Sequence, residues 1–131
     1  MIVTLELSDG VLEEALTAAY RTGLDWADRV RSFEGRTGRL EMELTRRTCT
    51  APLADGKWVI RERATSMSHA LTTGRLMNGL ALIAASEPTL FAVLSGHHRW
   101  PSAEDGDRLV QYALFGRVKY ERPREDRSLV P

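Results

Sequence analysis

The segment from Ser102 to Gly116 places the strongest constraint on how this chain can fold. Ser102 and Asp105 have the spacing of a capping box, and Gly116 supplies a C-terminal stop, so the segment predicts a helix. Apolar residues cover most of the circumference of that helix: Leu109, Val110, Ala113, Leu114 and Phe115. Such a helix is stable only when neighbouring elements cover it on several sides. We therefore expect it to be deeply packed, with Leu114 and Phe115 in the core.

Four other segments have a helical pattern of apolar residues. Asp9 supplies negative charge near the start of the first, Thr72 or Thr73 caps the third, and Pro88 fits the first turn of the fourth. Gly23 and the pair Ser95-Gly96 are suited to helix ends. The predicted helices cover residues 9–21, 24–33, 73–85 and 88–94.

Alternation of apolar and polar residues predicts the strands. It covers residues 2–7, and it recurs in the two arms of a predicted hairpin over residues 39–63, with Leu40, Met42 and Leu44 in one arm and Trp58 and Ile60 in the other. Val118 and Tyr120 are predicted to begin a short final strand. The sequence thus predicts an α+β fold, in which four or five helices cover one side of a small antiparallel sheet. Residues 1–120 form the predicted domain, and residues 121–131 a flexible tail.

Composition narrows the classes of function. The 131 residues suit one domain, and eighteen basic residues balance eighteen acidic ones, which argues against a dedicated, strongly basic nucleic-acid binder. The single cysteine, Cys49, excludes an intramolecular disulfide and a multi-thiolate metal site. No apolar run reaches the length of a membrane span, and no signal-like segment opens the chain. We expect a soluble, cytoplasmic protein without a cofactor.

The neutral total hides an asymmetry in the distribution of charge. Residues 1–28 carry six acids and one base, whereas residues 29–63 carry nine bases and five acids. Strand side chains on a polar face reach solvent, so the basic hairpin predicts a binding surface for an acidic partner. We assign that surface to four arginines and favour a protein as the partner: Arg46, Arg47, Arg61 and Arg63. The alternative is a small nucleic-acid-binding module, in which the hairpin 39–63 follows a phosphate backbone.

Of the three tryptophans, Trp26 and Trp58 are expected in the core, because an indole buries a large apolar area. Trp100 lies in the segment His97-His98-Arg99-Trp100-Pro101 and is the one expected to be exposed. An exposed tryptophan beside an arginine has the composition of an interface hot spot. Trp100 is therefore added to the predicted partner-binding residues.

No combination of residues carries a catalytic signature. A hydrolase or metal-dependent enzyme could be built on His97, His98, Asp105 and Asp107, but the fold would have to bring them together. We favour a solvated loop for the histidines and helix-dipole stabilisation for the aspartates. Cys49 could be a reactive thiol beside Arg46 and Arg47, but an inert strand cysteine is favoured. The expected protein is not an enzyme.

The end of the predicted last helix carries a resemblance to a known group of proteins. The run Asp107-Arg108-Leu109-Val110-Gln111-Tyr112-Ala113-Leu114-Phe115-Gly116-Arg117-Val118-Lys119-Tyr120 resembles the closing motif D-x-x-x-Q-x-A-L-F-G-x-V-x-Y of small uncharacterised bacteriophage and prophage proteins. The likeness extends over most of residues 3–120, and it departs from the pattern at Tyr20-Arg21-Thr22, where those proteins tend to have an acidic residue and two glycines.

The resemblance implies a phage or prophage accessory protein in the host cytoplasm. Such a protein would bind and modulate a host protein, for example a component of a defence system. No catalytic residue is implied by it, and the oligomeric state is left open.

Overall fold

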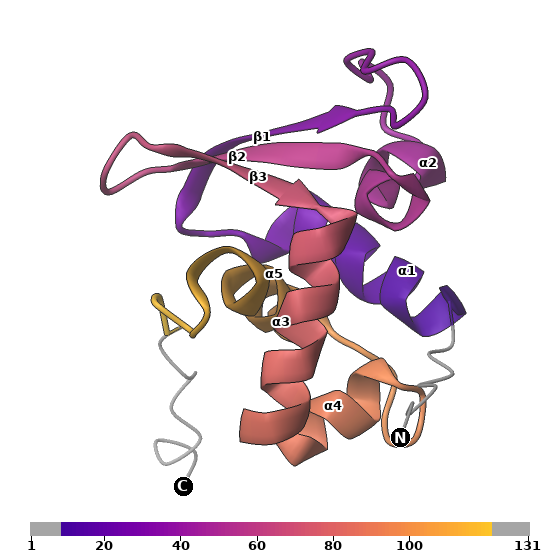
Figure 1. Ribbon diagram of the computed structural model, residues 1–131, viewed down its shortest axis with the longest axis vertical. Coiled ribbons are helices and arrows are strands. Elements are labelled where there is room, and N and C mark those ends of the chain that lie inside the picture. Colours follow the sequence, from indigo (N-terminus) through magenta and orange to yellow (C-terminus); the bar gives the residue numbers. More distant parts are fainter. Residues whose placement is uncertain (1–8, 122–131) are drawn as a thin grey trace, which may run out of the picture.

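The computed structural model describes residues 9–121, which form an α+β fold (Figure 1). A π-helical turn, η1, continues the first helix, and a short 3-10 helix, η2, follows α2. The elements, in chain order, are α1 (Asp9–Ala18), η1 (Ala19–Gly23), β1 (Ala27–Phe33), α2 (Arg46–Cys49), η2 (Ala51–Ala54), β2 (Lys57–Glu62), β3 (Ser68–Thr72), α3 (Thr73–Ser86), α4 (Pro88–Leu94) and α5 (Ala103–Phe115).

The three described strands form one antiparallel sheet in the order β1-β2-β3. Ile60 in the central strand lies opposite Val30 on one side and His69 on the other. Helices α1, α3, α4 and α5 all lie on the same side of the sheet (Figure 1). The predicted fold class, with helices covering one side of a small antiparallel sheet, is therefore confirmed.

Helix α5 is packed as deeply as its apolar circumference predicts, since Leu109 and Val110 are fully buried. Two glycines let neighbouring helices approach closely. A Cβ on Gly79 of α3 would lie 2.8 Å from the backbone nitrogen of Ala113, and one on Gly106 of α5 would lie 2.1 Å from the carbonyl oxygen of Ala15 in α1. Leu114 and Phe115 were predicted in the core, but they are only half-buried against it.

The helix-start signals in the second half of the chain are confirmed. Thr72 caps α3, Pro88 occupies the first turn of α4, and Ser102 forms a capping box with Asp105 at the start of α5. Gly116 ends α5 with a φ of 73°, a conformation that glycine adopts without a steric penalty. These boundaries depend on contacts within a few residues, which explains why the sequence predicts them well.

The prediction of a helix over residues 24–33 is wrong, because residues 27–33 form β1. Along this strand Val30 and Ser32 point inward, and they alternate with Arg29 and Arg31, which are exposed. The buried inner residue Ser32 is polar, so the usual apolar-polar alternation of a strand is hidden. The spacing of Trp26, Val30 and Phe33 then resembles a helical face.

The first arm of the predicted hairpin is also wrong. Residues 39–45 form no strand apart from an isolated bridge between Leu40 and Phe33, and the side chains of Met42 and Leu44 are 83% and 59% exposed. The second arm, β2, has the predicted alternation, with Trp58 and Ile60 buried. Because β1 and β3 already pair with the two edges of β2, residues 39–45 cannot pair with β2 as the predicted hairpin requires.

The predicted final strand at Val118 and Tyr120 does not form: residues 117–121 contain no strand, and the Gln111 side chain binds the backbone N–H and C=O of Tyr120. Strand β3 was not predicted from the sequence. The predicted strand over residues 2–7 and nearly all of the predicted tail, residues 122–131, lie outside the described residues.

Candidate functional site

The face of the sheet that points away from the helices carries four basic residues. Because strand side chains alternate, the burial of Trp58 and Ile60 against the helices directs Lys57 and Arg61 of β2 to the opposite face. On β1, Arg29 lies opposite Arg61, and Phe33 lies opposite Lys57. No described helix lies over this side of the sheet (Figure 1). We call Arg29, Arg31, Lys57 and Arg61 the basic sheet face.

Few carboxylates neutralise the basic sheet face. The Arg61 Nε lies 3.8 Å from the Asp28 Oδ1, which is an ion pair but is too long for a hydrogen bond. The Lys57 Nζ lies 5.6 Å from the centroid of the Phe33 ring, a weak cation–π contact. Within residues 9–121, no ion pair involves Arg29 or Arg31, and both residues are exposed. The face therefore presents positive charge to solvent.

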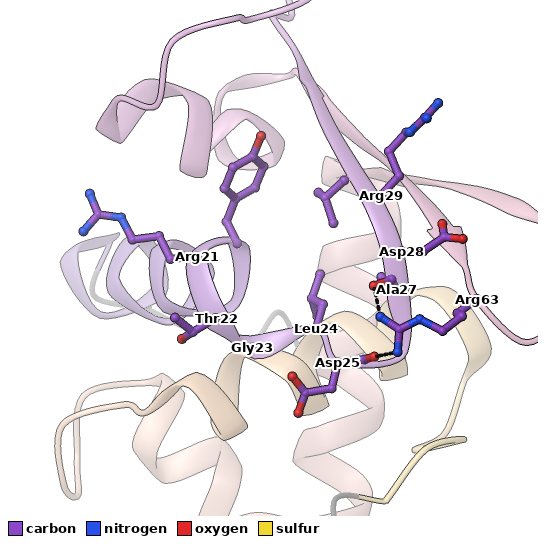
Figure 2. Close-up of a pocket in the computed structure, with 11 residues that line it drawn as sticks. Arg21, Thr22, Gly23, Leu24, Asp25, Ala27, Asp28, Arg29 and Arg63 are labelled. Carbon is purple, nitrogen blue, oxygen red and sulfur yellow. Dashed lines mark hydrogen bonds between the residues drawn. The ribbon is translucent and has the colours of Figure 1, made fainter.

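A groove of about 490 Å³ lies between η1 and the outer edge of β1 (Figure 2). Arg63 closes one side, where its guanidinium donates to the backbone oxygens of Asp25 and Ala27 at 2.6 and 3.2 Å. Arg29, which belongs to the basic sheet face, also lines the groove and points away from Arg21 in Figure 2. The groove and the basic sheet face are thus continuous at Arg29.

The edge of β1 offers backbone groups to this groove. The Ser32 oxygen accepts from the Glu41 nitrogen and the Glu34 nitrogen donates to the Arg39 oxygen, so both residues direct their backbone groups away from β2. By alternation along an antiparallel strand, the N–H and C=O of Val30 point outward as well. Val30 lines the groove. A ligand in the groove can therefore reach an open strand edge.

The four arginines predicted to bind a partner are not brought together. Arg46 pairs with Glu13 and Arg47 with Glu34, and Arg63 binds backbone oxygens. Of the four, only Arg61 belongs to the basic sheet face. The hairpin on which the prediction rested does not form, so its arginines belong to different elements.

Trp100 is exposed as predicted, with 66% of its surface accessible, whereas Trp26 and Trp58 are buried. The Trp26 Nε1 donates to the Asp107 Oδ1 at 2.6 Å. Arg99, beside Trp100, binds the Asp105 carboxylate through two guanidinium nitrogens. Trp100 therefore extends from a loop that is anchored to α5.

The four residues considered for catalysis lie in different environments. His97 and His98 are exposed in the loop after α4, while Asp105 and Asp107 are buried in the first turns of α5. Within residues 9–121, no group of three histidine, cysteine or carboxylate side chains is placed to hold a metal ion. Each aspartate instead accepts hydrogen bonds from protein groups.

Cys49 lies in α2 rather than in a strand, and it is fully buried. Burial is the largest influence on its thiol and raises its pKa, although Arg21 acts in the opposite direction. The reactive-thiol alternative required a lowered pKa. The inert role is therefore favoured, with Arg21 as the neighbouring cation in place of Arg46 and Arg47.

A buried carboxylate that the sequence analysis did not single out organises the end of the described chain. Glu62 is 1% exposed and accepts hydrogen bonds from the Lys119 Nζ at 2.6 Å, from the Tyr120 hydroxyl and from the Thr65 hydroxyl. The His69 Nε2 lies 3.0 Å from the Glu62 Oε1. The hydrogen bond from Lys119, with smaller contributions from Tyr120 and others, lowers the pKa of Glu62 to about 2 in spite of burial.

The closing motif has the same structural character. The Gln111 side chain accepts from the Tyr120 backbone nitrogen at 2.7 Å and donates to the Tyr120 backbone oxygen at 3.0 Å. The Gln111 side chain also donates to the Asp107 carboxylate, which accepts a second hydrogen bond from the Trp26 indole. Asp107, Gln111 and Tyr120 therefore fasten residues 117–121 against α5 and the sheet. This geometry supports the structural interpretation of these motif residues.

Sequence reasoning counted Arg29 and Arg31 in the basic region but placed them on a helix. Their spacing of two residues, with Val30 between them, was the signal that could have indicated a strand with a basic outer face. A weaker sequence signal pointed to the burial of Glu62: it continues the inward-facing series of Trp58 and Ile60.

Comparison with known proteins gives no further assignment. No protein-family model, curated protein or solved structure matches this chain. None of the helices within residues 9–121 is both long and apolar enough to cross a membrane.

Proposed function

We propose that this protein binds an acidic surface of a partner protein through the basic sheet face. The observation that carries the proposal is the group of four cations on a side of the sheet that no described helix covers, with a single carboxylate, Asp28, paired to it. Complementary charge accelerates association and selects among partners, so such a face suits recognition of an acidic protein. No catalytic step is part of this proposal.

The nature of the partner rests on different support. The resemblance of the closing motif to bacteriophage and prophage proteins favours an accessory role in which the partner is a host protein. Modulation of a host defence system is the most specific form of this proposal. The phage origin, the host partner and the cytoplasmic location stand together as one hypothesis, separate from the choice of binding surface.

Forms of this protein used as baits in a nuclease-treated bacterial lysate test the binding surface. The test bait carries Arg29→Glu and Arg31→Glu, and the control bait carries Arg36→Glu and Arg39→Glu, which make the same change of charge in an exposed loop. We expect a host protein that wild type and the control retain and the test bait loses. Equal retention by all three baits would remove the basic sheet face from the interface.

A salt series on the purified pair separates the two classes of partner. For a protein partner, we expect rising salt to slow association while dissociation changes little. If the face neutralises four phosphates of a nucleic acid, the affinity should fall about 100-fold between 50 and 200 mM salt. Tight binding of single-stranded DNA or RNA with this steep dependence would replace the proposed partner by the nucleic-acid alternative.

A further inference from the structure

The outward face of α3 is unusually apolar for a helix in contact with solvent. Within this helix Arg75 is the only charged residue, and none occurs from Leu76 to Ser86. Met77 and Leu82 are each 40% exposed, and Asn78, Ala81 and Ala85 are exposed as well. Solvent-facing sides of helices normally carry charged or strongly polar residues. In Figure 1 this helix lies on the viewer's side of the molecule, with α5 behind it.

Three of these residues form one straight row. Met77, Ala81 and Ala85 are spaced by four, so they form a ridge of the kind that packs against another helix. Asn78 and Leu82 flank the ridge on one side. The two alanines allow a second backbone to approach closely, and Met77 supplies a large, adaptable side chain. We call Met77, Ala81 and Ala85 the α3 outer row.

We propose that the α3 outer row binds the same row of a second copy of this chain, with the two helices antiparallel and the twofold axis near Ala81. In this arrangement Met77 of each copy lies opposite Ala85 of the other, so a large side chain meets a small one at both ends. A self-complementary patch of this kind is what a twofold interface requires. The proposal does not depend on the function of the basic sheet face.

Charge also favours a second copy in this orientation. The two Arg75 side chains would lie about 18 Å apart along the helix axes, because twelve residues separate their positions. That separation exceeds the screening length of about 8 Å at physiological salt, so their repulsion is small. The Arg75 guanidinium donates to the Ala70 backbone oxygen at 3.2 Å, which keeps this charge at the N-terminal end of its own α3 and away from the proposed axis. A parallel pair would bring the two arginines together.

The size of the surface sets the expected strength. One helix face of 14 residues cannot by itself bury the roughly 1,200–2,000 Å² of a standard stable interface. We therefore expect a monomer–dimer equilibrium with a dissociation constant in the micromolar range rather than a permanent dimer.

Sedimentation velocity of the full chain between about 5 and 500 µM tests the proposal. Wild type should shift from monomer to dimer over this range. Ala81→Glu, which places two carboxylates near the axis, should weaken the association at least about tenfold, while Leu44→Lys, at an exposed apolar residue of the loop after β1, should leave it unchanged. A monomer at every concentration, or a dimer that Ala81→Glu does not weaken, overturns the proposal.

The antiparallel register has its own test. Met77→Lys and Ala85→Glu should each weaken self-association, and an equimolar mixture of the two single variants should form a heterodimer, because Lys at 77 then faces Glu at 85. Lys and Glu are good helix formers, so circular dichroism should show folded variants. A mixture that associates no better than the separate variants overturns the proposed register.

Discussion

The two faces of the sheet are built from the same strands, but charged residues are buried and paired on the inner face and exposed on the outer one. On the inner face, Glu62 is buried and receives hydrogen bonds from Lys119, Tyr120 and Thr65. On the outer face, Arg29 and Arg31 are exposed and pair with no carboxylate among the described residues. A buried charge must be paired to be tolerated, whereas an exposed cation need not be. The inner face thus stabilises the fold, and the outer face is available to a partner.

This contrast predicts the largest loss of stability on the inner side of the sheet. Trp58 is fully buried in the central strand, so Trp58→Ala should lower the free energy of unfolding by about 3–5 kcal/mol. Its neighbour Val59 is on the outer face, and Val59→Ala should cost no more than about 1 kcal/mol. Urea denaturation followed by circular dichroism gives both values. Similar losses for the two variants would break the distinction between the faces.

Glu62 gives a second, smaller effect with a defined pH dependence. Its pKa is lowered to about 2 in the folded protein, from an ordinary value of 4.5, so the unfolded chain binds the proton more readily. The stabilisation by Glu62 is therefore present above pH 4.5 and is lost as the pH falls toward 2. At neutral pH, Glu62→Gln should lower the free energy of unfolding by about 1–3 kcal/mol.

Unfolding curves between pH 2 and pH 7 check this prediction. The loss of stability on acidification should be smaller in Glu62→Gln than in wild type, and Glu43→Gln, at an exposed loop residue, should behave like wild type. Identical pH profiles for wild type and Glu62→Gln would show that Glu62 is not the buried, ionised centre of its cluster.

The same contrast explains how far the sequence predicts this molecule. Local signals located α3, α4 and α5 well, because a cap such as Thr72 or Ser102 acts within three residues. Strand pairing depends on distant residues, so β1 was taken for a helix and residues 39–45 for a strand. The basic face could not be assembled from the sequence, because Arg29 and Arg61 become neighbours only through the β1–β2 register. The charge count indicated the region that contains the basic sheet face, but it could not separate paired from unpaired arginines.

Ser32 differs from the other polar residues of the inner face because its side chain is unpaired within residues 9–121, so we expect its removal to raise stability. Its hydroxyl is buried and is the one buried side-chain polar atom among the described residues without a hydrogen-bond partner. Leaving a buried hydroxyl unpaired is unfavourable, so Ser32→Ala should raise the free energy of unfolding by up to about 1 kcal/mol. Ser68→Ala, at an exposed position of β3, is the control and should change little. A clear loss in Ser32→Ala would mean that this hydroxyl does form a bond in the folded protein.

The smallest expected effect on stability is at Arg31, and there it is the informative result. Exposed substitutions away from special contacts usually change stability by no more than about 0.5 kcal/mol, so Arg31→Glu should unfold at nearly the same urea concentration as wild type. Partner capture by the same variant should nevertheless fall, because the charge of one residue of the basic sheet face is reversed. If Arg31→Glu instead lost stability to the extent expected for Glu62→Gln, Arg31 would be part of the framework. The outer face would then resemble the inner one, and the proposed binding surface would have to move along the edge of β1 into the groove beside Arg21.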